Sequence, residues 1–375
     1  MFAQIFRLAF AGLVTIVLIA GSNTETRAGA LAEAADWLNG IGLTYGRDQW
    51  TPEFARTAYS VNLTLAKKFN PKHMSHLKAM PELRSLNIGH QRFGDEELAM
   101  AVQLEWLTNL NLSRANVTKE GLAKITGMRS LRRLTLARTP LGGDAMVHIA
   151  ALKGLTSLNL NDTTIGDEGL EHLKTLPRLR RLDLQSAKGI TAKGLAAIAE
   201  MKSLSLLHLR SVKINTEIGA LAGSKTLSQL WLIRSNIDDD GAVEIAKIKS
   251  LEALSIQKTR ITDKGAAAIA TLPHLKTLYI GRTDITDIGL KSISQIKTLK
   301  KLGLNWTKIG DKGIAYFRGH PTIESIFARN TRVSDASVAV FLSMRKLRFL
   351  DLRNSHVTGA GVRKLMNSRN LRVAF

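Results

Sequence analysis

Arginine and aromatic side chains recur at fixed spacings in the second half of this sequence, and that combination could bind an anionic partner. A guanidinium group forms paired hydrogen bonds with a carboxylate or phosphate, and it stacks on aromatic rings. Trp, Tyr and Arg also contribute most of the binding energy when a partner buries them. The alternative is that Asp183 and His208 pair with each other while the aromatic residues pack on their neighbours. We predict a ligand- or partner-binding surface formed by Asp183, His208, Arg210, Trp231, Arg234, Tyr279, Arg282, Trp306, Phe327 and Arg329.

Three other groups have the residue types of a catalytic, metal or nucleotide site, but each has a simpler interpretation. The glycine-rich run from Gly40 to Gly46 has the wrong spacing for a dinucleotide loop and no strand–helix context. His73 and His76 are spaced like metal ligands, yet no third ligand is evident, so we interpret them as surface histidines. The acidic run 238–240 stands at a predicted helix start, where it complements the helix dipole. Because cysteine and paired catalytic carboxylates are also missing, we predict neither an enzyme nor a bound cofactor or metal.

The elements that must position the candidate binding residues follow a repeat of 24 residues. Only two steps deviate, 179→204 with 25 residues and 204→227 with 23, and the two deviations cancel. The frame L-x-x-L-x-L starts at Leu83, Leu107, Leu131, Leu155, Leu179, Leu204, Leu227, Leu251, Leu275, Leu299, Ile323, Leu347 and, truncated, Leu371.

The second half of each repeat has the spacing of a short helix, with apolar residues such as Leu290, Ile293 and Ile296. Thr or Asp precedes this segment, as in Thr286 and Asp287, and their oxygen atoms can cap the free amides of a helix start. Each repeat is therefore predicted to be a strand, a turn and a short helix. Gly recurs in the first helical turn of eight repeats, although it weakens a helix by about 1 kcal/mol relative to Ala. We predict that the helix start lies against the neighbouring coil, where a Cβ atom would hold the two apart.

This pattern resembles the leucine-rich repeat family over about residues 60 to 375, closest to its ribonuclease-inhibitor-like and bacterial 24-residue α/β subclasses. The resemblance implies an α/β fold: a right-handed solenoid, or horseshoe, of about 12–13 strand-turn-helix repeats with a parallel sheet on the concave face. Many family members carry Asn after L-x-x-L-x-L-x-x, whereas this sequence often carries Thr, for example Thr259, Thr283 and Thr307. A threonine hydroxyl is then expected to satisfy the backbone of the turn.

Side chains between the leucines point away from the core, because successive residues of a strand face opposite sides of the sheet. In the first four repeats these exposed positions are mainly Asn, Ser, Thr and Arg. From Asp183 onward they become aromatic and cationic. This change in composition is what locates the predicted binding surface, and in-register aromatic residues are rarely maintained on a face that only contacts water.

The two flanks of the array add predictions about its location. Residues 1–30 place one Arg before an apolar run and two small-residue cleavage sites, at 20–22 and 28–30, which is typical of a secretory signal peptide; an uncleaved membrane anchor is the alternative. Residues 31–59 fall outside the repeat and are predicted to form an N-terminal cap. Since disulfide-bonded caps are common in secreted animal and plant members of the family, the lack of cysteine points to a bacterial periplasmic or secreted protein.

The charge of the chain is strongly positive, at +22 with a pI near 10.3, which favours acidic partners. Lysines on the predicted helix faces, such as Lys247, Lys264 and Lys312, are interpreted as a solvated convex surface. Two classes of function remain: a non-enzymatic recognition scaffold for a protein or an anionic glycan, which the resemblance also implies, and a structural or envelope-spacing protein without a specific ligand. Nucleic acid would suit the charge, but the secretory leader argues against access to it.

Overall fold

A computed structural model describes residues 26–44, 48–67, 69–90, 93–368 and 371–375, so most of the predicted signal peptide lies outside the described residues. The chain divides into two compact units, residues 1–135 and 136–375, which are described separately. Within the described ranges no helix is both long enough and apolar enough to cross a membrane. The predicted extents of leader, cap and solenoid stay predictions.

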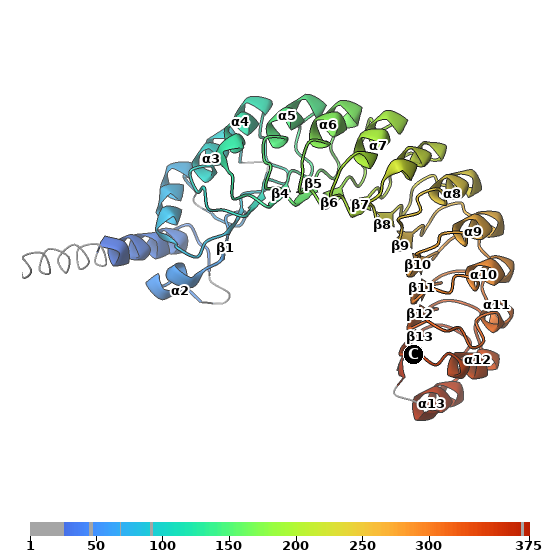
Figure 1. The fold of residues 1–375 in the computed structure, drawn as a ribbon. Helices are drawn as coiled ribbons and strands as arrows, with labels where there is room; N and C mark the ends of the chain where they lie inside the picture. The colour runs from blue at the N-terminus through green and yellow to red at the C-terminus, as the bar shows by residue number, and fades with distance from the viewer. Residues whose placement is uncertain (1–25, 45–47, 68, 91–92, 369–370) are drawn as a thin grey trace, which may run out of the picture. The chain divides into compact units, whose positions relative to one another are not determined.

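Unit 1 begins with helical segments and continues into four parallel strands, each paired in register with the next (Figure 1). Residues 26–40 are helical and precede α2 and the first strand. That strand, β1, precedes the first leucine frame and was missed in the sequence, because Val61 and Leu63 fill its core positions. The elements are α2 (Pro52–Thr57), β1 (Ser60–Asn62), η1 (Pro71–Ala79), β2 (Ser85–Asn87), α3 (Asp95–Ala101), β3 (Asn109–Asn111), α4 (Lys119–Ala123), η2 (Lys124–Gly127) and β4 (Arg133–Thr135).

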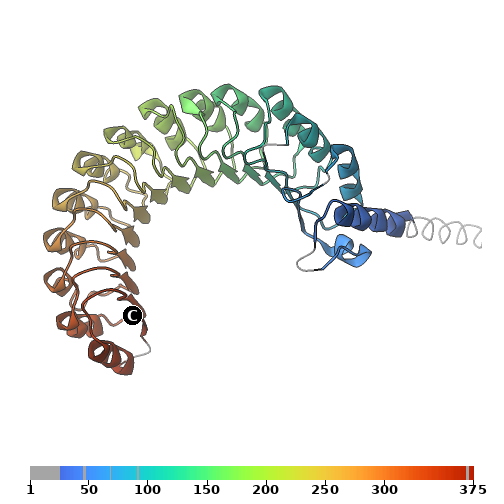
Figure 2. The same ribbon diagram turned by 180° about the vertical axis from the view of Figure 1, so that it is seen from behind.

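Unit 2 carries all of the predicted binding residues and contains ten parallel strands in sequential order. Its strands line the inner side of the unit and its helices the outer side (Figures 1 and 2). The elements are η3 (Gly143–Ala145), α5 (Met146–Ile149), β5 (Ser157–Asn159), α6 (Gly166–Leu173), β6 (Arg181–Asp183), α7 (Ala192–Ala199), β7 (Leu206–His208), η4 (Thr216–Gly223), β8 (Gln229–Trp231), α8 (Asp239–Ile245), β9 (Ala253–Ser255), α9 (Asp263–Ile269), β10 (Thr277–Tyr279), α10 (Asp287–Ile293), β11 (Lys301–Gly303), α11 (Asp311–Ala315), β12 (Ser325–Phe327), η5 (Asp335–Ser337), α12 (Val338–Ser343), β13 (Phe349–Asp351), α13 (Gly359–Ser368) and β14 (Arg372–Ala374).

The predicted solenoid of alternating strands and helices is confirmed. Its strands are parallel, and leucines at equivalent positions of the repeat are paired in the sheet register. Leu278, for example, pairs with Leu254 on one side and Leu302 on the other. Leu278 and the helix residues Leu290 and Ile293 are fully buried, so strand and helix enclose one continuous core. Stacking of similar coils buries apolar faces that a single repeat cannot bury alone.

The turn after each strand uses the threonine hydroxyl as expected. The hydroxyls of Thr259, Thr283 and Thr307 donate hydrogen bonds of 2.6–2.7 Å to the backbone carbonyl three residues earlier. Each bond stays within its own coil. It stabilises a turn whose preceding residue has a left-handed backbone, with φ between 54° and 63° in eleven repeats.

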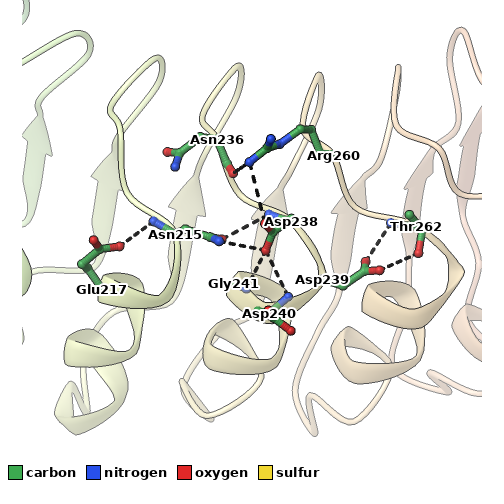
Figure 3. Close-up of polar contacts among 9 residues, drawn as sticks. All are labelled: Asn215, Glu217, Asn236, Asp238, Asp239, Asp240, Gly241, Arg260 and Thr262. Carbon is green, nitrogen blue, oxygen red and sulfur yellow. Dashed lines mark hydrogen bonds and ion pairs between the residues drawn. The ribbon is translucent and has the colours of Figure 1, made fainter.

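Aspartates at the helix starts bind the neighbouring coil, a role the sequence analysis did not assign to them. Asp239 accepts hydrogen bonds from the backbone amide of Thr262 at 2.8 Å and from its hydroxyl at 2.6 Å, one coil further on (Figure 3). It also accepts one from the amide of Gly265 at 2.9 Å. The bond from a backbone amide of the next coil recurs along a set that we call the carboxylate line: Asp239, Asp263, Asp287, Asp311 and Asp335. The hydroxyl bond is missing at Asp287, because the next coil has Gly310 at the place of Thr262.

The acidic run 238–240 lies at a helix start, as predicted. Asp238 is the N-cap of α8 and accepts hydrogen bonds from the amides of Asp240 at 3.1 Å and Gly241 at 3.4 Å. Asn215 of the preceding coil donates to its carboxylate at 2.8 Å (Figure 3). That hydrogen bond is the main reason why the pKa of Asp238 is lowered.

The recurrent glycine is explained sterically, which confirms the prediction. A Cβ atom built on Gly265 or Gly289 would lie 2.5 Å from the carboxylate oxygen of Asp239 or Asp263, respectively. That oxygen belongs to the preceding coil and is the one that accepts from the glycine amide. Glycine therefore admits the cross-coil cap, and a larger residue would displace it.

The register irregularity falls outside the sheet. Arg181 pairs with Leu206 and Leu206 with Gln229, so the strands stay in register through the 25- and 23-residue steps. Gly189 has φ of +76° in the turn after β6, and a short 3-10 helix, η4, replaces the α-helix of the next coil.

Candidate binding surface on the sheet of unit 2

A row of rings crosses the exposed face of the sheet. His208 and Trp231 are neighbours in register, with ring centroids 5.8 Å apart. Trp231 lies 5.9 Å from Tyr279, and Tyr279 lies 6.1 Å from Phe327. Phe349 continues the row at 5.3 Å from Phe327. We call these five residues the aromatic ladder: His208, Trp231, Tyr279, Phe327 and Phe349.

Small residues in the intervening strands allow the larger rings to meet. Ser255 stands between Trp231 and Tyr279 in the register and is fully buried. Gly303 stands between Tyr279 and Phe327, and a Cβ atom there would collide with the tyrosine ring. Packing of Tyr279 in the ladder also raises the pKa of its hydroxyl through burial. The alternation of large and small residues makes the ladder continuous.

Asp183 is held beneath one end of the ladder. Its carboxylate lies 2.6 Å from Nδ1 of His208, and Arg181 donates to it from Nε at 2.8 Å and from Nη2 at 3.1 Å. Burial opposes ionisation, but the hydrogen bonds from His208 and Arg181 outweigh it and lower the pKa of Asp183. With only 5 % of its surface exposed, Asp183 orients His208 rather than meeting a partner. Asp183 and His208 thus pair with each other, and Trp231, Tyr279 and Phe327 pack on one another, as the alternative interpretation of these residues predicts.

Four cations from consecutive coils form a second line, which we call the cationic row: Arg210, Arg234, Lys258 and Arg282. All four are exposed. Within the described ranges, their side chains make no ion pair of the kind that ties Lys276 to Glu252. The charge of Arg282 lowers the pKa of Lys258 most, followed by desolvation and by the charges of Arg234 and Arg210. The row therefore carries a repulsion that no acidic residue of its own neutralises.

Lys258 was omitted from the predicted surface although a signal was present. It occupies the same repeat position as Arg234 and Arg282, directly before the residue whose hydroxyl group satisfies the turn. All three have left-handed backbones, with φ of 61°, 56° and 57°. Because this conformation recurs in eleven coils, it is a property of the repeat, and only the residue types distinguish the cationic row.

Trp306 extends the row by one coil with an aromatic side chain. Its φ is 63°, and 49 % of its surface is exposed. The guanidinium carbon of Arg282 lies 4.6 Å from the ring centroid, which is the geometry of a cation–π contact. Arg282 and Trp306 are thus brought together as one exposed pair.

The last predicted residue, Arg329, lies further along the sheet and is half-buried. Its Nε is buried and finds no hydrogen-bond acceptor among the described residues. The next cation, Arg353, is occupied, because it forms a bidentate pair with Asp351 at 2.6 and 2.8 Å. The unpaired cations therefore end where this internal pair begins.

A hollow of about 260 Å³ opens beside the first coils of the ladder and the row. Its lining combines polar, cationic and aromatic groups: Asn161, Gln185, His208, Arg210, Trp231 and Ile233. The indole Nε1 of Trp231 is buried and has no hydrogen-bond partner in the described part of the chain. The hollow could accept a side chain or small group that carries a negative charge, because Arg210 forms part of its lining.

The other candidate groups form structural features of unit 1. The run from Gly40 follows a helix end, where Gly42 has φ of +77° and donates to the carbonyl of Asn39 at 2.9 Å. His73 is exposed, whereas His76 lies 3.8 Å from Glu33 and 5.9 Å from the ring of Trp37. Among the residues that are described, no cluster of three His, Cys, Asp or Glu side chains could hold a metal ion.

Comparisons with known proteins agree with this architecture. A family model described as Leucine Rich repeat matches residues 103–125, 155–174, 175–199, 247–270, 271–294, 295–317 and 343–366. An internalin from Listeria monocytogenes is similar in structure, with a TM-score of 0.56 and 21 % identity over 92 % of this chain and 94 % of that one. A leucine-rich-repeat protein from Leptospira interrogans has a TM-score of 0.43 and 17 % identity over 86 % of this chain and 97 % of that one. No curated protein matches the sequence.

Proposed function

Because this chain is a leucine-rich-repeat protein, we propose that it is a non-enzymatic recognition scaffold that binds an acidic partner on the sheet face of unit 2. Stacked repeats of this kind present extended concave surfaces, on which each coil contributes one or two side chains. The partner is a protein or an anionic glycan. The competing proposal, a structural or envelope-spacing protein, gives no role to exposed cations that lack acidic neighbours.

The observation that carries this proposal is the cationic row beside the aromatic ladder. Four like charges on successive coils repel one another, and a bound anion would relieve that repulsion. Arginine and aromatic residues are enriched where partners bind tightly. Here the aromatic residues lie on the strands, and the cations lie in the turns directly after β7 to β10. Arg353 is already bound by Asp351, whereas the cations that follow β7 to β10 have no acidic partner among the described residues. This difference supports a partner placed over β7 to β11.

The test compares three variants in affinity capture from the producing cell's envelope. Arg282→Ala removes one member of the cationic row, and Trp231→Ala removes one ring of the aromatic ladder. Lys264→Ala removes an exposed lysine from α9 and serves as the control. We expect recovery of a captured species to fall about tenfold for the first two variants only, with unchanged melting of the Arg282 and Lys264 variants. Equal recovery for all three would place the working surface elsewhere.

Residues 1–30 are proposed to direct export of the chain to a bacterial periplasm or to the outside of the cell. Support comes from the order of an Arg, an apolar run and small residues in the sequence. Intact-mass measurement of exported protein should give a start near Asn23 or Leu31. A soluble cytoplasmic pool that starts at Met1 would contradict export.

A further inference from the structure

The aromatic ladder and the cationic row run side by side, and their separation limits what can cover both. In the repeat, the ladder residue precedes the row residue by three positions, as Trp231 precedes Arg234 and Tyr279 precedes Arg282. Three residues span at most about 10 Å, so the backbones of the two lines lie no further apart than that. A partner must therefore be about that wide and must present an apolar stripe next to an acidic one.

We propose that the occupant is an acidic amphipathic α-helix of a protein partner, lying across the strands from β7 to β11. This proposal rests on the proposed function and specifies the partner. An α-helix with side chains is about 10–12 Å across, so one helix covers the ladder and the row together. Residues three and four apart lie on one face of a helix, which places an acidic stripe beside an apolar one.

The spacing along the row also favours a helix over an extended peptide. Neighbouring strands are about 4.8 Å apart, and one helical turn rises about 5.4 Å. Arg234, Lys258 and Arg282 share one repeat position, whereas Arg210 stands one position earlier in its coil. Over the two steps between Arg234 and Arg282, a carboxylate on each turn of a helix drifts by only about 1 Å from its cation. In an extended strand, side chains on one face repeat every ~6.6 Å, and the drift reaches about 4 Å. The long Arg and Lys side chains can absorb the first mismatch more readily than the second.

The hollow beside Trp231 gives the helix an anchor at one end. It is lined by His208 and Arg210, and the guanidinium group of Arg210 could bind a carboxylate at the end of the helix. At the other end, the Arg282–Trp306 pair offers a charged group stacked on an exposed ring. A helix seated between these two points would contact four or five coils.

The experiment uses three synthetic peptides of equal length, each of about 18 residues or five turns. The first carries Glu at alternating three- and four-residue spacings with Leu on the adjacent stripe. The second has the same residues in an order that spreads Glu around the helix, and the third has two central residues of the first exchanged for Pro, which breaks the helix. Binding to the exported chain is measured by fluorescence anisotropy at two salt concentrations.

We expect the first peptide to bind at least tenfold more tightly than the other two. Its affinity should fall at least tenfold for the Arg234→Ala or Arg282→Ala variant but not for Lys264→Ala.

Equal binding of the Pro-containing peptide would overturn the proposal of a helix and indicate an extended acidic partner. Equal binding of the spread-charge peptide would likewise overturn it. If a short polyuronate displaces the first peptide more effectively than an acidic helix does, the partner is a glycan. In these three outcomes the recognition proposal stands if Arg282→Ala still abolishes envelope capture; if capture is unaffected as well, both proposals fail.

Discussion

Two lines of charged residues, the carboxylate line and the cationic row, run along unit 2. The first has hydrogen-bond partners in the next coil, and the second has no acidic partner among the described residues. Each member of the carboxylate line accepts hydrogen bonds from the next coil, as Asp263 does from Thr286 at 2.7 Å. Each member of the cationic row stands free of acidic residues in the described part of the chain, and the row's own charges lower the pKa of Lys258. Repetition alone therefore says little about function. The difference lies in whether the neighbouring coil supplies the partner.

The largest effect is expected from a change that removes the coil on which both lines depend. Leu278 in β10 is fully buried between two leucines of the neighbouring strands. Leu278→Asp would bury an unpaired charge there and should cost more than about 4 kcal/mol. Circular dichroism and thermal melting of the variant should show unfolding. Unchanged melting would mean that the core frame is assigned incorrectly.

A smaller loss of stability is expected when the cap of the carboxylate line is displaced. In Gly289→Ala the new Cβ atom would press on the carboxylate of Asp263, and the strain should exceed the ~1 kcal/mol gained in helix propensity. The net destabilisation should be about 1–2 kcal/mol in urea denaturation. Gly223→Ala, where no atom lies within 4 Å of the new Cβ, is the matched control and should change stability by less than about 0.5 kcal/mol.

Acid should weaken the carboxylate line at Asp311 and Asp335. Hydrogen bonds from Thr358 lower the pKa of Asp335. Burial opposes ionisation of Asp311, but hydrogen bonds from Ser334 and Ser337 outweigh it, so the pKa of Asp311 is lowered as well. A lowered folded pKa contributes stability above the unfolded value of about 3.9, and this contribution disappears as the pH falls through the folded pKa values. The melting temperature should therefore decline below about pH 4.

The double variant Asp311→Asn, Asp335→Asn tests this origin of the acid sensitivity, because its amides do not titrate. Between pH 5 and strongly acidic buffer, its melting temperature should decline less than that of the unmodified chain. Parallel declines would assign the acid sensitivity to other carboxylates.

The smallest effect is expected in the cationic row. Lys258→Gln removes one of four mutually repelling charges, so the melting temperature should rise slightly at low salt. Added salt should abolish this gain, because it screens exposed charges. Lys264→Gln, on the exposed face of α9, should show no comparable gain. A loss of stability in Lys258→Gln would show that the row has a structural partner.

Much of the fold could be predicted because its causes are local in the repeat. The leucine frame locates the strands, the threonine at positions such as Thr283 satisfies its own turn, and the recurrent glycine signals a close approach. The partner of Asp263 could not be predicted, since a carboxylate at a helix start can cap its own helix or the next one. The register of the coils decides between the two.

The candidate site was predictable in composition and less so in arrangement. The sequence places aromatic residues on one face, but it does not reveal that buried Ser255 and Gly303 let rings two coils apart meet. Nor does it show that Asp183 faces His208 and is buried, because that depends on the orientation of two side chains. Lys258 differs from Arg234 and Arg282 in residue type alone, and a single lysine in the sequence resembles the many solvated lysines of this basic chain.

The forward direction of the carboxylate line makes the two ends of the array unequal in how they come apart. Asp239 caps the coil of α9, Asp263 that of α10, and Asp287 that of α11, so each coil supplies the cap of its successor. When a coil detaches from the C-terminal side, the helix starts of the remaining coils of the carboxylate line keep their caps. Peeling one from the N-terminal side strips the cap from the coil behind it. In a linear array governed by nearest-neighbour terms, fraying therefore proceeds more easily from the C-terminal side, and hydrogen exchange of the helix-start amides would record a gradient along the chain.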